Sequence, residues 1–238
     1  MSRPQGSDIT DVTSQNGPTT SDLAGLGPFF AVEFHNRGDD PPEPWLGLRA
    51  LLSDDDVLVS RVDQVRESLA LGSPTGTVDR RVAASVTHLG LVARLIAPAI
   101  GAAALGGTHL SLRADDLWWQ DRLGGPYPLS VSTRDDGPWA HPAVDALTSA
   151  TGERFGVSEH VLSGNVASAA NGAAKMIGLA RPDLAENARA AADEILADRR
   201  VEGGLLRAGP SFRRRSCCLI YQVAGNRSAV CGDCVLNR

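Results

Sequence analysis

All four cysteines of this 238-residue chain, Cys217, Cys218, Cys231 and Cys234, lie within its last 22 residues. Core packing does not explain this crowding, because a buried cysteine behaves as a small apolar residue that can be placed anywhere in a core. Four thiolates held together without a cation would repel one another and stay reactive. A soft metal ion or cluster shared by the four sulfurs is therefore the natural explanation.

The residues between the cysteines predict a β-hairpin. Apolar residues flank Gly225-Asn226, a favourable two-residue turn, in the interval between Cys218 and Cys231. In that register Cys217 lies opposite Cys234, and cross-strand neighbours are about 5 Å apart. Successive side chains on a strand point to opposite faces, so the adjacent pair Cys217-Cys218 requires a bulge or turn to reach one metal.

The spacing of the cysteines leaves the metal open. Sites with four cysteines hold structural zinc, [2Fe–2S] clusters and [4Fe–4S] clusters alike. A zinc ribbon usually has two Cys-x-x-Cys pairs, and only Cys231–Cys234 has that form. A vicinal disulfide or a thioredoxin-type motif is less favoured, because that redox motif normally opens a helix after a strand. From the residues alone, an iron–sulfur protein and a zinc-stabilised binding module without redox activity remain equal alternatives.

The rest of the chain predicts an α+β fold in which helices dominate. From Thr77 to Leu105 apolar residues recur every three or four positions on all sides, which indicates a buried core helix that Pro98 kinks or splits. Further helices are predicted over residues 45–52, 142–151, 158–179 and 183–199, with the acidic residues 53–56 as a cap or turn. Period-two segments at 29–34, 109–112, 117–119 and 129–132 predict strands, the last three forming a small antiparallel meander. Helices and strands do not alternate regularly, which argues against a doubly wound parallel sheet.

The predicted organisation is one domain over residues 28–238, in which 211–238 form the cysteine segment. Residues 1–27 are polar and predict a disordered arm without the pattern of a secretory signal, so we expect a cytoplasmic protein. The net charge of −5 argues against a basic protein that coats nucleic acid. The longest apolar run, 95–107, is shorter than the roughly 20 residues of a membrane span, so no transmembrane segment is expected.

A family resemblance rests on the terminal motifs. Arg214-Arg215-Ser216-Cys217-Cys218, followed by Cys231-Gly232-Asp233-Cys234 near the end of the sequence, resembles the FhuF-like ferric-siderophore reductases. Weaker likenesses are that of residues 88–98 to the family's buried helix and that of Leu162-Ser163-Gly164-Asn165 to a recurrent Ser-Asn segment. The twelve residues between the two cysteine pairs are more than the family usually has. The resemblance implies that the four cysteines bind a [2Fe–2S] cluster, and it favours iron–sulfur over zinc.

The resemblance also implies a function. A [2Fe–2S] protein of this family would reduce Fe(III) held by a siderophore, and the weaker hold of hard oxygen ligands on Fe(II) would release the iron in the cytoplasm. Its partners would be the ferric siderophore and an unidentified protein that donates electrons, because no dinucleotide fingerprint is present; the resemblance leaves room for peripheral association with a membrane. Outer-sphere electron transfer needs no acid–base residue, so no catalytic side chain is assigned. An electron carrier for another enzyme is the remaining alternative.

Several polar residues receive expectations of their own. Arg214 and Arg215 match the family motif, and they would stabilise the negative charge of a reduced cluster or, alternatively, form a solvated charge run. His88 lies within the apolar helix and is expected to be a hydrogen-bonded core residue rather than a ligand. Ser163 and Asn165 are expected to form helix-cap or interhelical hydrogen bonds rather than to line a siderophore pocket.

Overall fold

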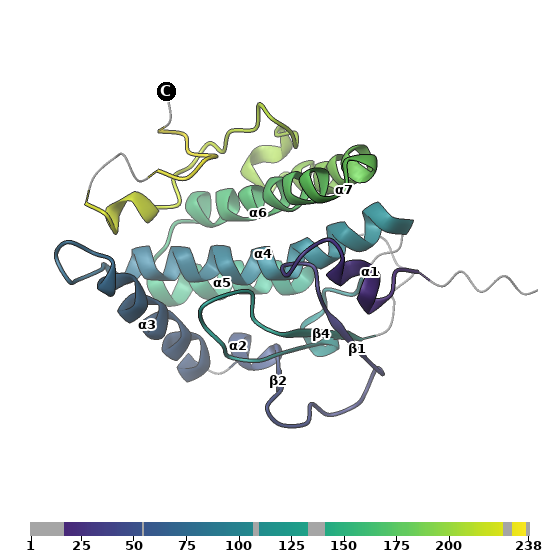
Figure 1. The fold of residues 1–238 in the computed structure, drawn as a ribbon. Coiled ribbons are helices and arrows are strands. Elements are labelled where there is room, and N and C mark those ends of the chain that lie inside the picture. The colour runs from purple at the N-terminus through teal and green to yellow at the C-terminus, as the bar shows by residue number, and fades with distance from the viewer. Residues whose placement is uncertain (1–16, 54, 107–109, 133–140, 226–229, 237–238) are drawn as a thin grey trace, which may run out of the picture.

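The long apolar segment forms one continuous helix, α4 (Arg80–Gly106), at the centre of the protein (Figure 1). The computed structural model describes residues 17–53, 55–106, 110–132, 141–225 and 230–236. Most side chains of α4 from Val82 to Ala104 are buried, so the predicted core helix is confirmed. Pro98 lies inside α4 and does not end it, so the predicted division into two helices is not observed.

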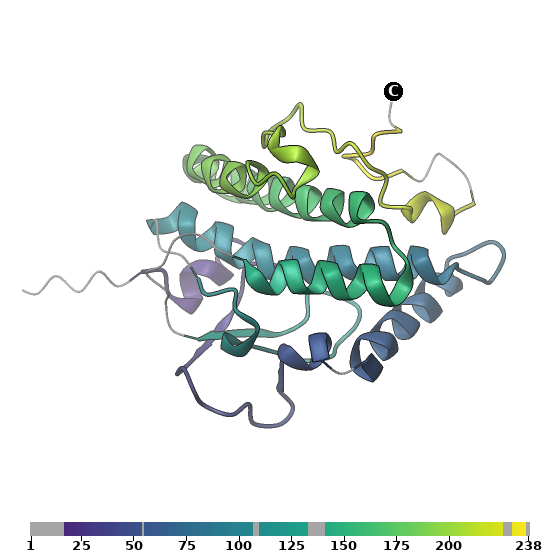
Figure 2. The same ribbon diagram turned by 180° about the vertical axis from the view of Figure 1, so that it is seen from behind.

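Four longer helices pack around α4, and their ends follow ordinary capping chemistry. Their bounds are α3 (Asp55–Leu71), α5 (Pro142–Phe155), α6 (Glu159–Ala180) and α7 (Ala185–Leu196). Pro142 occupies the first turn of α5, where a missing N–H costs nothing, and Ser158 caps α6 by accepting from the N–H of Val161. Helices α6 and α7 cover the side of α4 that faces away from the sheet (Figures 1 and 2).

By length and composition, α4 could cross a membrane. About two-thirds of its most apolar window is buried inside the protein, against the helices and sheet that surround it. A helix that is apolar on every side and enclosed in this way is the usual core helix of a small helical domain.

The sheet is small and mixed rather than purely antiparallel as predicted. Its strands are β1 (Glu33–His35), β2 (Leu46–Gly47), β3 (Leu117–Trp119) and β4 (Leu129–Ser132), in the order β1-β4-β3-β2. Strand β1 pairs with β4 in parallel, and the other pairs are antiparallel. Parallel strands need a long crossover connection, and the helices that lie between β1 and β4 in the chain provide one. Residues 110–112 form no strand.

Two local predictions about helices were incomplete. Leu46-Gly47, expected to begin a helix over 45–52, pairs instead with Trp118-Trp119, and only α2 (Arg49–Ser53) is helical there. This tertiary pairing outweighs the local preference of a short segment. Of the residues 53–56, expected to form a cap or turn, Ser53 ends α2, and Asp55 and Asp56 begin α3. The sequence pattern did not predict α3, because its apolar residues form no clear stripe.

The N-terminal boundary of the fold was predicted too late in the chain. Thr20–Ala24 form helix α1, and the side chains of Leu23 and Leu26 are buried. Both lie so close to Gly101 of α4 that a Cβ there would be 3.1–3.2 Å from them. The predicted disordered arm over residues 1–27 is therefore wrong for its last part, and residues 1–16 lie outside the described structure.

The predicted C-terminal hairpin is also absent from the described residues. Leu219 adopts a left-handed conformation with φ of 69°, and Ile220–Gln222 form a short 3-10 helix, η4, where a strand was expected. One left-handed residue turns the chain out of an extended path. The predicted turn continues into residues 226–229, which lie outside the described structure. The cysteine segment lies along the outer side of α6, at the surface of the helical body (Figure 2).

Candidate metal centre

Loops, rather than paired strands, bring the four cysteines together. Cys217 and Cys218 precede η4, and Cys231 and Cys234 belong to a turn in which the N–H of Cys234 donates to the carbonyl of Cys231 at 3.0 Å. The sulfur atoms of Cys218 and Cys231 are 3.6 Å apart, and the thiol of Cys217 interacts with that of Cys234. The four side chains thus form two thiol pairs, Cys218 with Cys231 and Cys217 with Cys234. Each pair joins one cysteine that precedes η4 to one that follows it.

The two pairs do not form a compact site for a single ion. Among the described residues, no three cysteine, histidine or acidic side chains converge closely enough to hold one metal ion. A [2Fe–2S] cluster is also bound by four cysteines, and its ligands are shared between two irons. The four thiols supply the number of ligands that such a cluster needs.

Backbone N–H groups point at two of the sulfurs. The N–H of Leu219 donates to Cys217 Sγ, and that of Leu236 donates to Cys234 Sγ, both at 3.3 Å. In each case the donor lies two residues after the cysteine. Such hydrogen bonds favour the thiolate over the thiol and are among the groups that adjust the reduction potential of iron–sulfur clusters.

The thiols perturb one another's ionisation. The hydrogen bond between Cys218 and Cys231 lowers the pKa of Cys218 to about 6, and the charge of Arg214 acts in the same direction. The same hydrogen bond, with burial second, raises the pKa of Cys231, and burial raises the pKa of Cys217. Cys218 therefore forms a thiolate easily, whereas Cys217 and Cys231 resist ionisation; the charges of neighbouring thiolates add to the effects of hydrogen bonding and burial. A cationic group bound between them removes that resistance.

Arg214 is buried beside the thiols, with only 1% of its surface exposed. Its Nη1 donates to Asn165 Oδ1 at 3.0 Å, and its Nη2 donates to the carbonyl of Val161 and to Ser216 Oγ. Its backbone N–H donates to the carbonyl of Asp233 at 3.2 Å, which joins the two halves of the cysteine segment. The buried Nε–H has no acceptor among the described residues. An unsatisfied buried N–H costs about 1–3 kcal/mol, so an anionic acceptor close to this Nε–H would stabilise the folded segment.

Arg215, which the sequence analysis grouped with Arg214, lies differently. Its side chain is exposed, and Nη1 donates to the carbonyl of Glu202 at 3.4 Å. Its backbone N–H donates to Glu202 Oε2 at 2.6 Å. Arg214 therefore has the position expected of a charge that acts on the thiols, whereas Arg215 serves mainly through its backbone.

Glu202 is the functional residue that sequence reasoning missed. Its Oε1 accepts from both the N–H and the hydroxyl of Ser216, at 2.9 and 2.7 Å, and its own N–H donates to Ser163 Oγ at 2.6 Å. Glu202 is buried and has a φ of 47°, which few residues other than glycine adopt. The only sequence signal is the Gly203-Gly204 pair that follows, typical of a sharp turn but silent about the carboxylate.

The Ser163-Gly164-Asn165 segment of α6 receives these polar groups. Gly164 leaves the room, because a Cβ there would overlap Ser216 Oγ and lie 2.6 Å from atoms of Arg214 and Glu202. The amide of Asn165 donates to the carbonyl of Ser85 on α4 at 2.9 Å, which confirms the expected interhelical hydrogen bond. Ser85, which the sequence analysis did not single out, continues the chain of contacts to the cysteine segment: Ser85 Oγ donates to the carbonyl of Cys218 at 2.9 Å.

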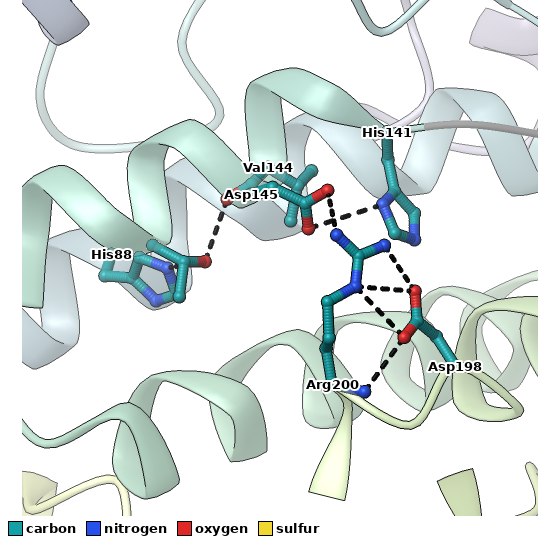
Figure 3. A network of polar contacts seen from close by, with 7 residues as sticks. His88, His141, Val144, Asp145, Asp198 and Arg200 are labelled. Atoms are coloured by element: carbon teal, nitrogen blue, oxygen red, sulfur yellow. Dashed lines mark hydrogen bonds and ion pairs between the residues drawn. The ribbon is translucent and has the colours of Figure 1, made fainter. Parts of the chain in front are cut away.

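His88 is a core residue, as expected. Its Nε2 lies 3.0 Å from Thr148 Oγ1 of α5 (Figure 3). Burial, with a smaller contribution from Arg214, lowers the pKa of His88 to about 3, so the ring is neutral. Figure 3 also shows Arg200, whose Nη1 donates to Asp145 of α5 at 2.7 Å and which pairs with Asp198. This ion-pair network joins α5 to the segment that precedes Glu202.

The donor set of four thiols, supported by N–H donors and a buried guanidinium, is that of a protein that binds a metal cluster through four cysteines. Residues 214–236 match the FhuF 2Fe-2S C-terminal domain, so this segment belongs to that domain family and its cofactor is a [2Fe–2S] cluster. The choice between zinc and iron–sulfur, open from spacing alone, is thereby decided. A search of curated proteins finds no match.

The residues present fit this cluster. The four thiols supply the complete ligand set, and the N–H groups of Leu219 and Leu236 satisfy two of the sulfurs. The unpartnered Nε–H of Arg214 offers a further donor, and its positive charge suits an anionic cluster. When bound, a [2Fe–2S] cluster supplies one-electron redox chemistry.

Proposed function

We propose that this protein is a ferric-siderophore reductase, in which one electron passes from the C-terminal cluster to Fe(III) held by a siderophore. The observation that carries the proposal is the FhuF-type cysteine segment at the surface of the helical body, with Cys217 and Cys231 half-buried. A redox site at this depth suits electron transfer to a complex that binds from outside.

The chemistry follows from ligand preference. Hydroxamate and catecholate oxygens are hard ligands that hold Fe(III) much more tightly than Fe(II). The gain of one electron by the iron, matched by the one-electron oxidation of the cluster, leaves an Fe(II) complex that releases its metal. A one-electron donor protein then has to restore the reduced state. In the electron-transfer step itself no bond to the siderophore has to break and no proton has to move; the iron–oxygen bonds break afterwards, when Fe(II) is released. The role of the side chains is therefore to hold the redox site, to set its charge and to keep it accessible.

Each part of the site has a role in this proposal. Arg214 places a positive charge where negative charge accumulates on reduction, and Glu202 and Ser216 hold its segment in place. The four cysteines form no disulfide in the described structure, and cysteine ligands must be reduced before they bind iron. A reducing compartment keeps them so, which supports a cytoplasmic location.

The proposal is tested by single-turnover electron transfer. Holoprotein is purified anaerobically, reduced with dithionite, separated from excess reductant and mixed with a ferric trihydroxamate or tricatecholate in the presence of an Fe(II) chelator. The reoxidation of the cluster and the appearance of Fe(II) should proceed at the same rate and in equal amounts. The reference reaction replaces this protein by a reduced ferredoxin of similar potential and uses the same ferric complex. If this protein is reoxidised no faster than the ferredoxin, it is an electron carrier for another enzyme instead.

The ligand set is tested by four Cys→Ser variants at positions 217, 218, 231 and 234. Each should lose most of its visible absorbance when it is expressed anaerobically. The matched control is Val235→Ser, which alters an exposed side chain in the same turn and should keep the full spectrum. A Cys→Ser variant with an unchanged all-cysteine spectrum and EPR signal would remove that residue from the ligand set.

A further inference from the structure

A cavity of about 290 Å³ adjoins the cysteine segment between α6 and α7. One of its walls is Gly232-Asp233, the two residues between Cys231 and Cys234. Two residues that lie between cluster ligands in the sequence therefore form part of the cavity wall. A molecule bound here would lie next to the redox site, and electron transfer rates fall steeply with distance.

Three cations surround this cavity in a chain whose net charge is −5. They are Lys175 of α6, which is the only lysine in the sequence, Arg189 of α7 and Arg213 of the cysteine segment. All three side chains are exposed, and within the described parts of the chain none forms an ion pair within 4 Å. Some other surface arginines, such as Arg181 beside Asp183, are paired. The described lining contains a single carboxylate, that of Asp233, so positive charge dominates.

The cavity also has a fixed shape and an apolar floor. Phe212 and Ala174 are buried beneath it, and Gly209 at its rim is held by an N–H that donates to Asn171 Oδ1 at 3.0 Å. Its volume is at the lower end of the range for small-molecule sites, so it suits one face or arm of a chelate rather than an entire large complex. A ligand that combines anionic oxygens with flat apolar groups would satisfy both rim and floor.

We infer that this cavity binds the ferric substrate and that it selects anionic chelates, such as catecholate complexes, over neutral ones. The inference rests on the proposed reductase function and adds a substrate class to it. The ammonium of Lys175 and the guanidinium groups of Arg189 and Arg213 contact the anionic oxygens, while the ligand's aromatic faces lie on the apolar floor. The iron is then held beside the Cys231–Cys234 turn.

The test measures binding without electron transfer. Holoprotein is titrated by calorimetry with the gallium(III) complex of a tricatecholate, which is anionic, and with that of a trihydroxamate, which is neutral; neither metal centre can be reduced. The variant K175Q/R189Q removes two charges from the rim. The control R113Q/R122Q removes two exposed charges on the sheet side of the protein, away from the cavity. Lys175→Glu alone repeats the test should the double variant prove less stable.

We expect the anionic complex to bind more tightly than the neutral one, and K175Q/R189Q to weaken it about tenfold or more at low salt, with a smaller effect at high salt. The control variant should bind as the unmodified protein does. Absence of binding by either complex, or equal affinity in K175Q/R189Q and unmodified protein, would overturn the inference. A defect of K175Q/R189Q confined to electron entry from an acidic donor protein would overturn it as well, and would assign the three cations to donor docking.

The outcome is separable from that of the reductase proposal. Gallium complex that binds in the cavity, in a protein that fails to reduce the iron complex, supports the site and refutes the reductase. Reduction of the anionic iron complex with the same half-saturating concentration in K175Q/R189Q refutes the site and leaves the reductase standing.

Discussion

Replacement of Gly164 by alanine tests whether the polar contacts over α6 hold the cluster segment. A Cβ at this position would overlap Ser216 Oγ and would lie 2.6 Å from Arg214 Nη2 and from Glu202 Oε1. Backbone on one side and buried charged groups on the other leave it no free space. Gly164→Ala must therefore move Ser216, Arg214 or Glu202.

The expected cost follows from opposing contributions. Alanine is about 1 kcal/mol better than glycine inside a helix, which favours the variant. Overpacking of a filled site costs about 1–3 kcal/mol, and loss of the charged hydrogen bond between Ser216 and Glu202 costs about 1.5–3 kcal/mol more. The net effect is a destabilisation of about 1.5–5 kcal/mol. In a chain of this length each kcal/mol lowers the midpoint of thermal unfolding by about 2–4 °C.

The matched control is Gly172→Ala, two turns further along the same helix, where a Cβ would meet nothing within 4 Å. Thermal unfolding and the cluster absorbance per protein are measured for both variants. Gly172→Ala should be neutral or slightly stabilised with a full cluster, and Gly164→Ala should unfold earlier and lose cluster. If the two variants were equally stable and equally loaded, the contacts over Gly164 would not hold the segment.

Three further predictions concern the site and the core. Arg214→Gln should lower the reduction potential of the cluster by about 40 mV, since one nearby charge is worth about 1 kcal/mol for a one-electron couple. Arg214→Lys and Arg215→Gln should change the potential much less. Equal shifts for Arg214→Gln and Arg215→Gln in a dye-mediated redox titration would contradict this prediction. The pKa of His88 in the folded protein is about 3, below its ordinary 6.5, so between these values the unfolded state binds one more proton than the folded state. The free energy of unfolding should therefore fall as the pH drops from 6.5 to 4.5, by up to about 1.4 kcal/mol per pH unit. Urea titrations should show a shallower pH dependence for His88→Gln, and parallel plots of stability against pH for the two proteins would refute the assignment. Leu23→Ala should cost about 2–5 kcal/mol because Leu23 is fully buried in α1; an unchanged midpoint would mean that α1 does not pack on α4.

The two buried charges explain why the cysteine segment sits where it does. Arg214 and Glu202 are both almost fully enclosed. The guanidinium of Arg214 donates to Asn165 of α6 and to Ser216, and the carboxylate of Glu202 accepts from Arg215 and Ser216 of the cysteine segment. A buried charge that loses its partners is strongly unfavourable, so the segment cannot shift along α6 without a large penalty. The two charges thus fix the position of the cysteine segment on α6 more than they stabilise the fold. A cluster near the surface requires such a fixed position.

The sequence by itself determined the parts of this protein that depend on local pattern and on residue chemistry. The apolar run that became α4, the capping signals of α5 and α6, and the gathering of Cys217 to Cys234 at one end are all readable without a structure. Four cysteines this close together in the sequence indicate a shared metal cofactor, because four thiolates without a cation would repel one another. Their resemblance to FhuF-like proteins, and later the match over residues 214–236, named that cofactor.

Only the tertiary structure decided how these parts meet. The β1–β4 pairing is parallel because distant segments meet there, and Leu23 is buried because α4 offers the space at Gly101. The hairpin prediction failed at Leu219, whose left-handed turn is compatible with many sequences and marked by none. The Gly203-Gly204 pair marked a turn beside Glu202, but nothing local marked the role of its carboxylate, because its partners Ser163 and Ser216 are remote in the chain. Contacts of this kind are set by three-dimensional packing, to which periodicity and spacing along a chain are blind.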